Sequence, residues 1–146
     1  MLKSSIEKLR IDVVSGEESA LSLLISRDGT LGRHGSGVLP ADSTSVLGKT
    51  DGQIFTALIE LLDEQVLAYA EVYDHPNKAG IPITCSIVFQ GGDATEVAIF
   101  EFRFGSETPD VGELLPYFDT FIAQAISLTD AWYEIEKMKL EKPLQH

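Results

Sequence analysis

The chain has 146 residues, 44% hydrophobic and 23% charged, with a formal net charge of −12. This length and apolar content are those of one folded domain that buries about two thirds of its unfolded surface, so we expect a single domain over residues 1–146 rather than a disordered chain. The excess of acidic residues disfavours nucleic acid and anionic membranes, because both are bound mainly through Lys and Arg.

The first elements in the chain are three predicted strands. Apolar residues alternate on both sides of a turn at residues 15–19, which predicts a half-buried hairpin. Asp28-Gly29 favours a second tight turn, and a short third strand is expected at about Thr30 to His34. In the first hairpin the expected apolar pairs are Val13 with Leu21, Ile11 with Leu23 and Leu9 with Ile25.

A long loop and an amphipathic helix come next. Residues 35–49 contain three glycines, a proline and several Ser and Thr, which predicts a loop that is either mobile or functional. Thr50 and Gln53 have the spacing of a capping box, so a helix is expected to begin there. Its apolar stripe comprises Phe55, Leu58, Leu62, Val66 and Tyr69. Its opposite face carries the candidate partner-binding residues Glu60, Asp63, Glu64 and Glu71.

A second hairpin is predicted between residues 81 and 104. Its apolar side chains alternate around a turn centred on Gly92-Asp93. The other face of this hairpin is mixed, because Glu101 and Arg103 alternate on it. The expected cross-strand pairs are Ile87 with Ala98, Cys85 with Phe100 and Ile83 with Phe102.

A final helix begins either at Thr108-Pro109 or near Glu113, because Pro116 fits only the first turn of a helix. Its buried stripe includes Trp132, whereas Tyr133 is expected closer to the edge of that stripe. Residues from about 139 to 146 are expected to fray. The predicted order is βββαββα, an α+β fold in which an antiparallel sheet carries two helices on one face.

The negative charge is concentrated in one part of the chain. Residues 50–136 contain two basic and sixteen acidic residues, a balance of 2 − 16 = −14, whereas residues 1–49 contain six of each and the last ten add 3 − 1 = +2. A field of one sign speeds the encounter with a positively charged partner and repels polyanions. The charge therefore indicates a protein partner with a basic surface; solubility alone is the alternative explanation.

An alternative ligand site lies around the third predicted strand. His34 would act as a general base oriented by Asp28, Arg33 would hold an anion, and residues 35–49 would close over them as a lid. That arrangement describes a small enzyme or a ligand-binding protein. The spacing supplies no nucleophile, and a polar hairpin end explains the same residues, so we expect a protein that is not an enzyme.

Neither a metal nor a cofactor is expected. Asp74 and His75 are adjacent, whereas a zinc site needs four spaced ligands and a calcium loop needs carboxylates at alternate positions. The glycine clusters do not join a strand directly to a helix, as a phosphate-binding loop does. Cys85 is expected on the apolar face of a strand, which is typical of an inert buried thiol.

Cysteine usage and the N-terminus indicate the cytoplasm. Cys85 is the single cysteine, so no intramolecular disulfide can form, which is typical of a reducing compartment. The first residues alternate charged and apolar side chains without the apolar core of a secretory signal. No apolar run approaches the ~18 residues that span a bilayer.

The element order, the size and the acidity resemble those of class I type III secretion chaperones. The matching parts are the strands in 9–34, the helix from Asp51, the hairpin in 81–104 and the final helix with Trp132. The resemblance implies a cytoplasmic dimer that holds a segment of a secreted effector. Residues 1–8 are too short for the amphipathic helix with which that family opens. Immunity proteins, which block toxins with acidic surfaces, are equally compatible.

We therefore expect a non-enzymatic, protein-binding module that is chaperone-, immunity- or adaptor-like. Either the acidic helix face or the mixed face of the sheet would meet the basic partner. A homodimer through the mixed face is the third alternative.

Overall fold

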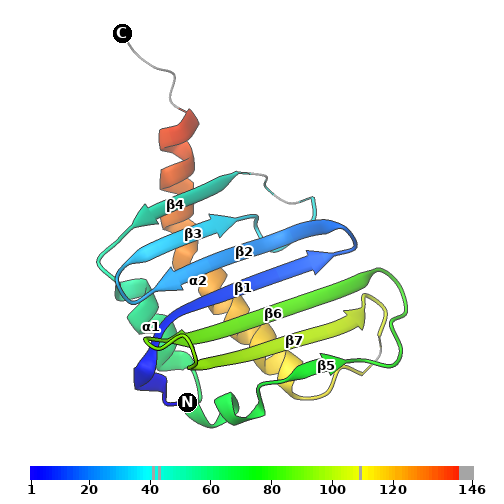
Figure 1. The fold of residues 1–146 in the computed structure, drawn as a ribbon. Helices are drawn as coiled ribbons and strands as arrows, with labels where there is room; N and C mark the ends of the chain where they lie inside the picture. Colours follow the sequence, from blue (N-terminus) through cyan, green and yellow to red (C-terminus); the bar gives the residue numbers. More distant parts are fainter. Residues whose placement is uncertain (41, 43, 109, 142–146) are drawn as a thin grey trace.

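The computed structural model describes residues 1–40, 42, 44–108 and 110–141, which form one sheet with two helices on one face (Figure 1). The strands are β1 (Ile6–Ser15), β2 (Glu18–Ser26), β3 (Thr30–His34), β4 (Ser45–Lys49), β5 (Val72–Asp74), β6 (Pro82–Gly91) and β7 (Val97–Gly105). The helices are α1 (Gln53–Leu61) and α2 (Leu114–Glu141), with 3-10 turns η1 (Lys3–Ser5) and η2 (Glu64–Tyr69). This architecture confirms the predicted α+β class.

The sheet has the strand order β4-β3-β2-β1-β6-β7-β5. All neighbouring strands are antiparallel except β5, which runs parallel to β7. β4 and β5 are the two edge strands, and both are additions to the predicted βββαββα order. α2 crosses behind the sheet from the β5 edge to the β4 edge and projects past it (Figure 1).

The core lies between the helices and the side of the sheet that faces them. Period-2 alternation places every second residue of the central strands on this side, where the side chains are almost completely buried. They include Leu9, Ile11, Leu23, Ile25, Ile87, Phe89 and Phe100. Phe118 of α2 is fully buried and its ring centroid lies 4.6 Å from that of Phe100. Each such side chain contributes about 1.5–3 kcal/mol, which explains how two helices hold a wide sheet together.

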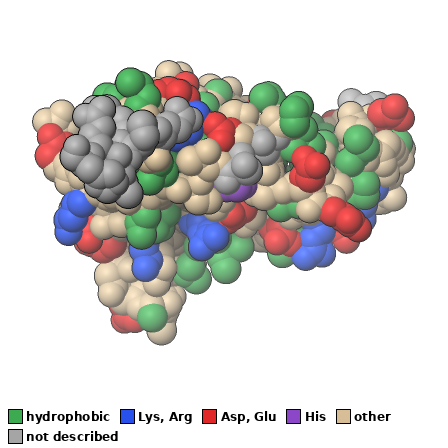
Figure 2. Space-filling view, turned by 90° about the horizontal axis from the view of Figure 1, so that it is seen from above, with side chains coloured by type: hydrophobic (Ala, Val, Ile, Leu, Met, Phe, Trp, Pro, Cys, Tyr) green, Lys and Arg blue, Asp and Glu red, His purple; other side chains and the backbone are tan. Residues whose placement is uncertain are grey.

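The opposite face of the sheet carries no helix and has a mixed surface. Arg10 pairs with Asp12 at 2.9 Å, and Arg103 pairs with Glu101. Figure 2, seen from the β4 edge, shows basic and acidic side chains interspersed with exposed hydrophobic ones. The negative charge is therefore not uniform over the molecule, in agreement with the balanced composition of residues 1–49.

The register of the first hairpin is confirmed and that of the second is shifted. Val13 pairs with Leu21, as predicted, and the ladder continues to Leu9 and Ile25. In the second hairpin Ile87 pairs with Phe100 rather than Ala98, Cys85 with Phe102 and Ile83 with Phe104. The shift arises because the Asp93 side chain accepts a hydrogen bond from the Thr95 amide, which makes the turn longer than expected. A shift of two keeps the same residues on the buried side.

The predicted loop at 35–49 is wrong in its last part, because residues 45–49 form β4. Val46 is buried, and the Thr50 amide donates to the carbonyl of Gly29 across the start of β3. β4 has only this one buried residue, so it lacks the repeated alternation that identifies a strand in a sequence.

The observed first helix is also shorter than the predicted one, which extends over about residues 50–71. α1 ends at Leu61, where Lys3 Nζ donates to the carbonyl of Leu62 at 2.7 Å, and η2 and β5 follow. The predicted capping box does not form. Gly52, with φ 86°, is the N-cap residue, and the Asp51 carboxylate accepts a hydrogen bond from the Gln53 amide. The contact with Lys3 joins residues far apart in the chain, and local periodicity contains no sign of it.

α2 begins at Leu114, so Pro116 lies in its first turn, which agrees with the alternative start near Glu113. Tyr133 is buried and Trp132 is half-buried, the reverse of the predicted order. The expected fraying concerns residues 139–146; the helix continues to Glu141, and residues 142–146 lie outside the described part of the chain. Within the described part, no helix combines the length and apolar character needed to cross a bilayer.

Candidate functional site

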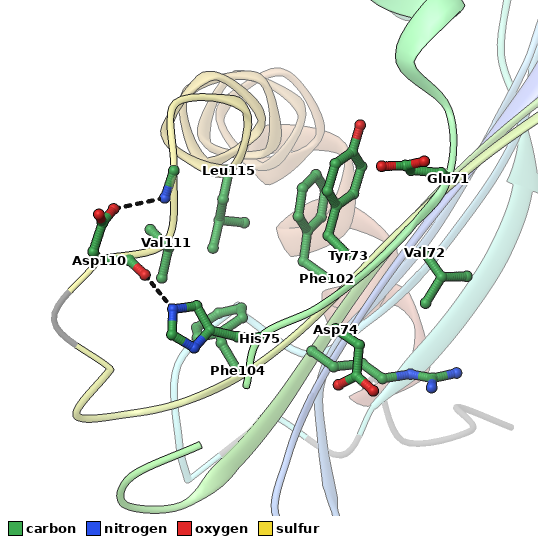
Figure 3. Close-up of a pocket in the computed structure, with 12 residues that line it drawn as sticks. Glu71, Val72, Tyr73, Asp74, His75, Phe102, Phe104, Asp110, Val111 and Leu115 are labelled. Carbon is green, nitrogen blue, oxygen red and sulfur yellow. Dashed lines mark hydrogen bonds between the residues drawn. The ribbon is translucent and has the colours of Figure 1, made fainter. Parts of the chain in front are cut away.

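A groove opens at the β5 edge of the sheet, between β5, β7 and the segment that leads into α2 (Figure 3). We call it the edge groove; its volume is about 480 Å³. It is lined by Glu71, Val72, Tyr73, Asp74, His75, Phe102, Arg103, Phe104, Asp110, Val111, Gly112 and Leu115. Because β5 alternates sides, Glu71, Tyr73 and His75 face the helix side of the strand, and Val72 and Asp74 face away from it.

The floor of the edge groove is aromatic and aliphatic. The rings of Tyr73 and Phe102 are stacked, with centroids 5.1 Å apart and planes 10° apart. Phe104, Val111 and Leu115 complete the apolar surface (Figure 3). Tyr73 is half-buried, and burial together with the charge of Glu71 raises the pKa of its hydroxyl. The hydroxyl stays protonated and donates to the carbonyl of Tyr69. One face of the ring stacks on Phe102, so a ligand would meet the opposite face.

A histidine joins two walls of the edge groove. His75 Nδ1 accepts a hydrogen bond from the Asn77 amide at 2.9 Å, so the proton of the neutral ring lies on Nε2. His75 Nε2 therefore donates to the carbonyl of Asp110. The Asp110 carboxylate in turn accepts from the Gly112 amide at 2.9 Å. Both ring nitrogens are engaged, so His75 positions the segment before α2 and is not available as a general base.

The rim of the edge groove is negatively charged. It has three carboxylates, Glu71, Asp74 and Asp110, and one guanidinium, Arg103, which is paired with Glu101. Asp74 is bound by Lys78 at 2.6 Å, and this hydrogen bond lowers its pKa. Within the described residues, Glu71 and Asp110 have no cationic partner within ion-pair distance. Two carboxylates therefore remain to attract an incoming cation.

The structure distributes the predicted partner-binding residues over several elements rather than one helix face. Glu60 lies on α1 and is exposed, and Asp63 accepts from the Gln65 amide at the start of η2. Glu64 accepts from the backbone amide of Lys3 at 2.9 Å. Only Glu71 lines the edge groove. The common acidic stripe is absent because the helix ends at Leu61.

Asp28, Arg33 and His34 do not form one site. Successive residues of β3 point to opposite sides of the sheet, so Arg33 is buried toward α2 and pairs with Asp130 at 2.7 Å. His34 lies on the mixed face, where its Nδ1 is 2.8 Å from Ser45 Oγ. Asp28 accepts from the Thr30 amide, and this hydrogen bond lowers its pKa. The predicted arrangement of a base, an orienting carboxylate and an anion-binding arginine is not assembled.

The described part of the loop before β4 is tied to α2. Tyr133 donates its hydroxyl to the carbonyl of Thr44 at 2.6 Å, and Lys137 Nζ lies 2.7 Å from the Asp42 carboxylate. These bonds hold the loop against α2. A loop that opened and closed as the predicted lid would have to break them. Cys85 is 3% exposed, and burial raises its pKa to about 12, so its thiol is unreactive at neutral pH.

Sequence reasoning missed the edge groove for a physical reason. β5 has three residues and pairs in parallel with β7, so neither its length nor its alternation marks it as a strand. Within the described residues, no group of three or more His, Cys, Asp and Glu is arranged to hold a metal ion. Comparisons of the chain with protein-family models, curated proteins and solved structures find no match.

Proposed function

We propose that this protein is a non-enzymatic binding module whose edge groove accepts a partner segment with basic and apolar side chains. The observation that carries the proposal is the stacked pair Tyr73–Phe102 beneath carboxylates that lack a cationic partner among the described residues. An apolar floor with a charged rim matches an Arg or Lys side chain, whose aliphatic stem packs while its head stays at the edge.

The contacts in the groove set the strength expected of this interaction. A guanidinium over the exposed face of Tyr73 contributes about 0.5–1 kcal/mol, and an ion pair with Glu71 or Asp110 at a partly exposed rim contributes about 0–1 kcal/mol. Apolar neighbours in the segment add about 25 cal/mol for each Å² that they bury against Val111 and Leu115. Several modest contacts give a dissociation constant in about the micromolar range. The −14 charge of residues 50–136 adds a salt-sensitive increase in the association rate.

The proposal covers chaperone-, immunity- and adaptor-like roles in the cytoplasm. Holding a segment of a secreted effector is the version that agrees with the resemblance to class I type III secretion chaperones. A role as an enzyme has less support, because His75 has no free ring nitrogen and the thiol of Cys85 is buried.

A fluorescence-anisotropy titration tests the proposal. The probe is a labelled twelve-residue peptide that alternates Arg or Lys with Leu or Phe, and the reference peptide has Glu in place of each basic residue. We expect the basic peptide to bind at low salt and the acidic one not to bind. Absence of binding of the basic peptide at low salt contradicts the proposal.

A pair of variants with equal charge separates the groove from the general field. In Glu71→Gln/Asp110→Asn the rim is neutralised, while the amide oxygen at position 110 still accepts from Gly112. The control Glu17→Gln/Glu96→Gln removes the same charge at two exposed positions outside the groove. We expect the groove variant to weaken binding about fivefold or more, which corresponds to about 1 kcal/mol, and the control less than about twofold. Equal losses in both would assign the binding to the overall charge and refute the groove.

A further inference from the structure

The C-terminal half of α2, whose end projects past β4, carries a second apolar stripe. Leu128 and Ala131 begin the stripe, and Ile135 and Met138 continue it. Leu128 is half-buried and also packs against the core, whereas Ile135 is 54% and Met138 61% exposed. Figure 1 shows that the sheet ends before α2 does, so this stretch of helix has no strand beneath its end. We call these four residues the outer seam.

The outer seam has the spacing of a coiled coil. Its members are separated by three, four and three residues, which are the a and d positions of two successive heptads. At about 100° for each residue, the seam lies ~140° around the helix from the stripe that packs on the sheet. A second helix on the seam would therefore meet no part of the protein's own sheet, and the two sheets would lie on the outer sides of the pair.

The charges beside the outer seam favour a second copy in parallel orientation. Glu134 occupies a g position and Lys139 the following e position, five residues later. In a parallel pair, Glu134 of each copy lies opposite Lys139 of the other, so the contact forms twice; in an antiparallel pair, g residues face g residues. Residues 134–140 contain two acidic and two basic residues, 2 − 2 = 0, so two copies of an acidic protein can approach here without strong repulsion.

We propose that the outer seam is the interface of a parallel, two-fold symmetric dimer of this chain. Glu134 and Lys139 also pair within their own chain, with Lys137 at 2.8 Å and with Glu136 at 3.0 Å, so the contacts between copies exchange with these pairs. Two heptads make a small interface, below the ~1,200 Å² of standard complexes, so we expect dissociation in about the micromolar to millimolar range. The helix needs no nucleation on association, since its first half is already held by the core.

Sedimentation velocity and single-cysteine crosslinking test the dimer. We expect a monomer at ~5 µM and a growing dimer fraction up to ~1 mM. Ala131→Cys and Met138→Cys should each form a disulfide with the same residue of a second copy, because d positions meet across a parallel seam. Ala123→Cys, exposed on another side of α2, is the matched control and should crosslink much more slowly. The native Cys85 is buried and does not compete.

Three outcomes would refute the dimer, its parallel orientation or the outer seam as its interface. A monomer at ~1 mM refutes the dimer. Crosslinking of position 131 to position 138 in a mixture of the two variants, without like-to-like crosslinks, refutes the parallel arrangement. Ile135→Asp should abolish the dimer. The circular-dichroism spectrum should not change, because the Ile135 side chain is half exposed in the single chain. A dimer that survives this substitution also refutes the seam. None of these readouts depends on peptide binding in the edge groove.

Discussion

Replacing Arg33 with alanine removes the side chain that ties β3 to α2. The guanidinium is 3% exposed and lies 4.4 Å from the centroid of the Tyr133 ring. Its Nε–H and the two Nη1–H groups meet four acceptors, so one N–H is shared between two of them. Its acceptors are Gly35 O at 3.0 Å, Ile126 O at 3.2 Å, Thr129 Oγ1 at 3.1 Å and Asp130 Oδ1 at 2.7 Å. At about 1 kcal/mol net for each of the three N–H groups and about 1 kcal/mol for the ring contact, the gross loss is about 4 kcal/mol.

Removing a buried charge also removes its desolvation cost, which offsets about half of that loss. We therefore expect Arg33→Ala to lower the free energy of unfolding by about 2 kcal/mol. Arg33→Lys keeps the charge without the planar fork and should cost about 1–2 kcal/mol. The assay is urea unfolding followed by the fluorescence of Trp132, the single tryptophan.

The matched control is Arg10→Ala, because Arg10 is an exposed arginine whose pairing with Asp12 contributes about 0–1 kcal/mol. A ligand-binding role for Arg33, as the alternative site required, predicts little loss of stability. Equal effects of Arg33→Ala and Arg10→Ala would refute the assignment of Arg33 as the anchor between β3 and α2.

The local geometry of Asp42, Cys85 and Gly29 has consequences that can each be measured. The hydrogen bond from Lys137, together with those from Thr44, lowers the folded-state pKa of Asp42 to about 2. The stability that these bonds contribute is therefore present above the unfolded pKa of ~3.9 and is lost as the pH falls toward about 2. NMR titration of Asp42 should show a midpoint near 2, and a midpoint near 4 contradicts the tether. Burial raises the pKa of Cys85 to about 12, so a thiol reagent at pH 8 should react only after unfolding, and fast labelling of the native protein contradicts that burial. At Gly29, with φ 96°, an added Cβ would lie 1.9 Å from Thr50 O, so Gly29→Ala should lower the free energy of urea unfolding by more than about 2 kcal/mol. The control is Gly112→Ala, whose Cβ meets nothing within 4 Å and which should cost about 1 kcal/mol. Equal losses in the two variants would show that the Thr50 contact relaxes without cost.

The parts of the fold that a sequence predicts are those whose signal is local. The first hairpin repeats apolar residues at every second position on both strands, and its register follows from that pattern and the turn. α2 repeats its buried residues over several turns, and Pro116 limits where it begins. Burial of Cys85 follows in the same way from its place in an alternating strand.

The parts that were missed depend on contacts between distant residues. α1 ends where Lys3 reaches the carbonyl of Leu62, 59 residues away in the chain. β4 and β5 are strands because they complete the edges of a sheet, and neither contains enough buried residues to show a period. The charge of Glu71 makes it a candidate in the sequence, but its place beside Tyr73 depends on a parallel pairing that no local pattern indicates.

The most direct test of peptide binding in the edge groove is an NMR titration of the ¹⁵N-labelled protein with the unlabelled basic peptide. We predict the largest shift changes for the backbone amides of Tyr73, His75, Phe102 and Val111, with a matching loss in the Glu71→Gln/Asp110→Asn variant. Changes confined to the mixed sheet face or to the outer seam, with the amides of β5 and β7 unaffected, would contradict the edge groove as the binding site.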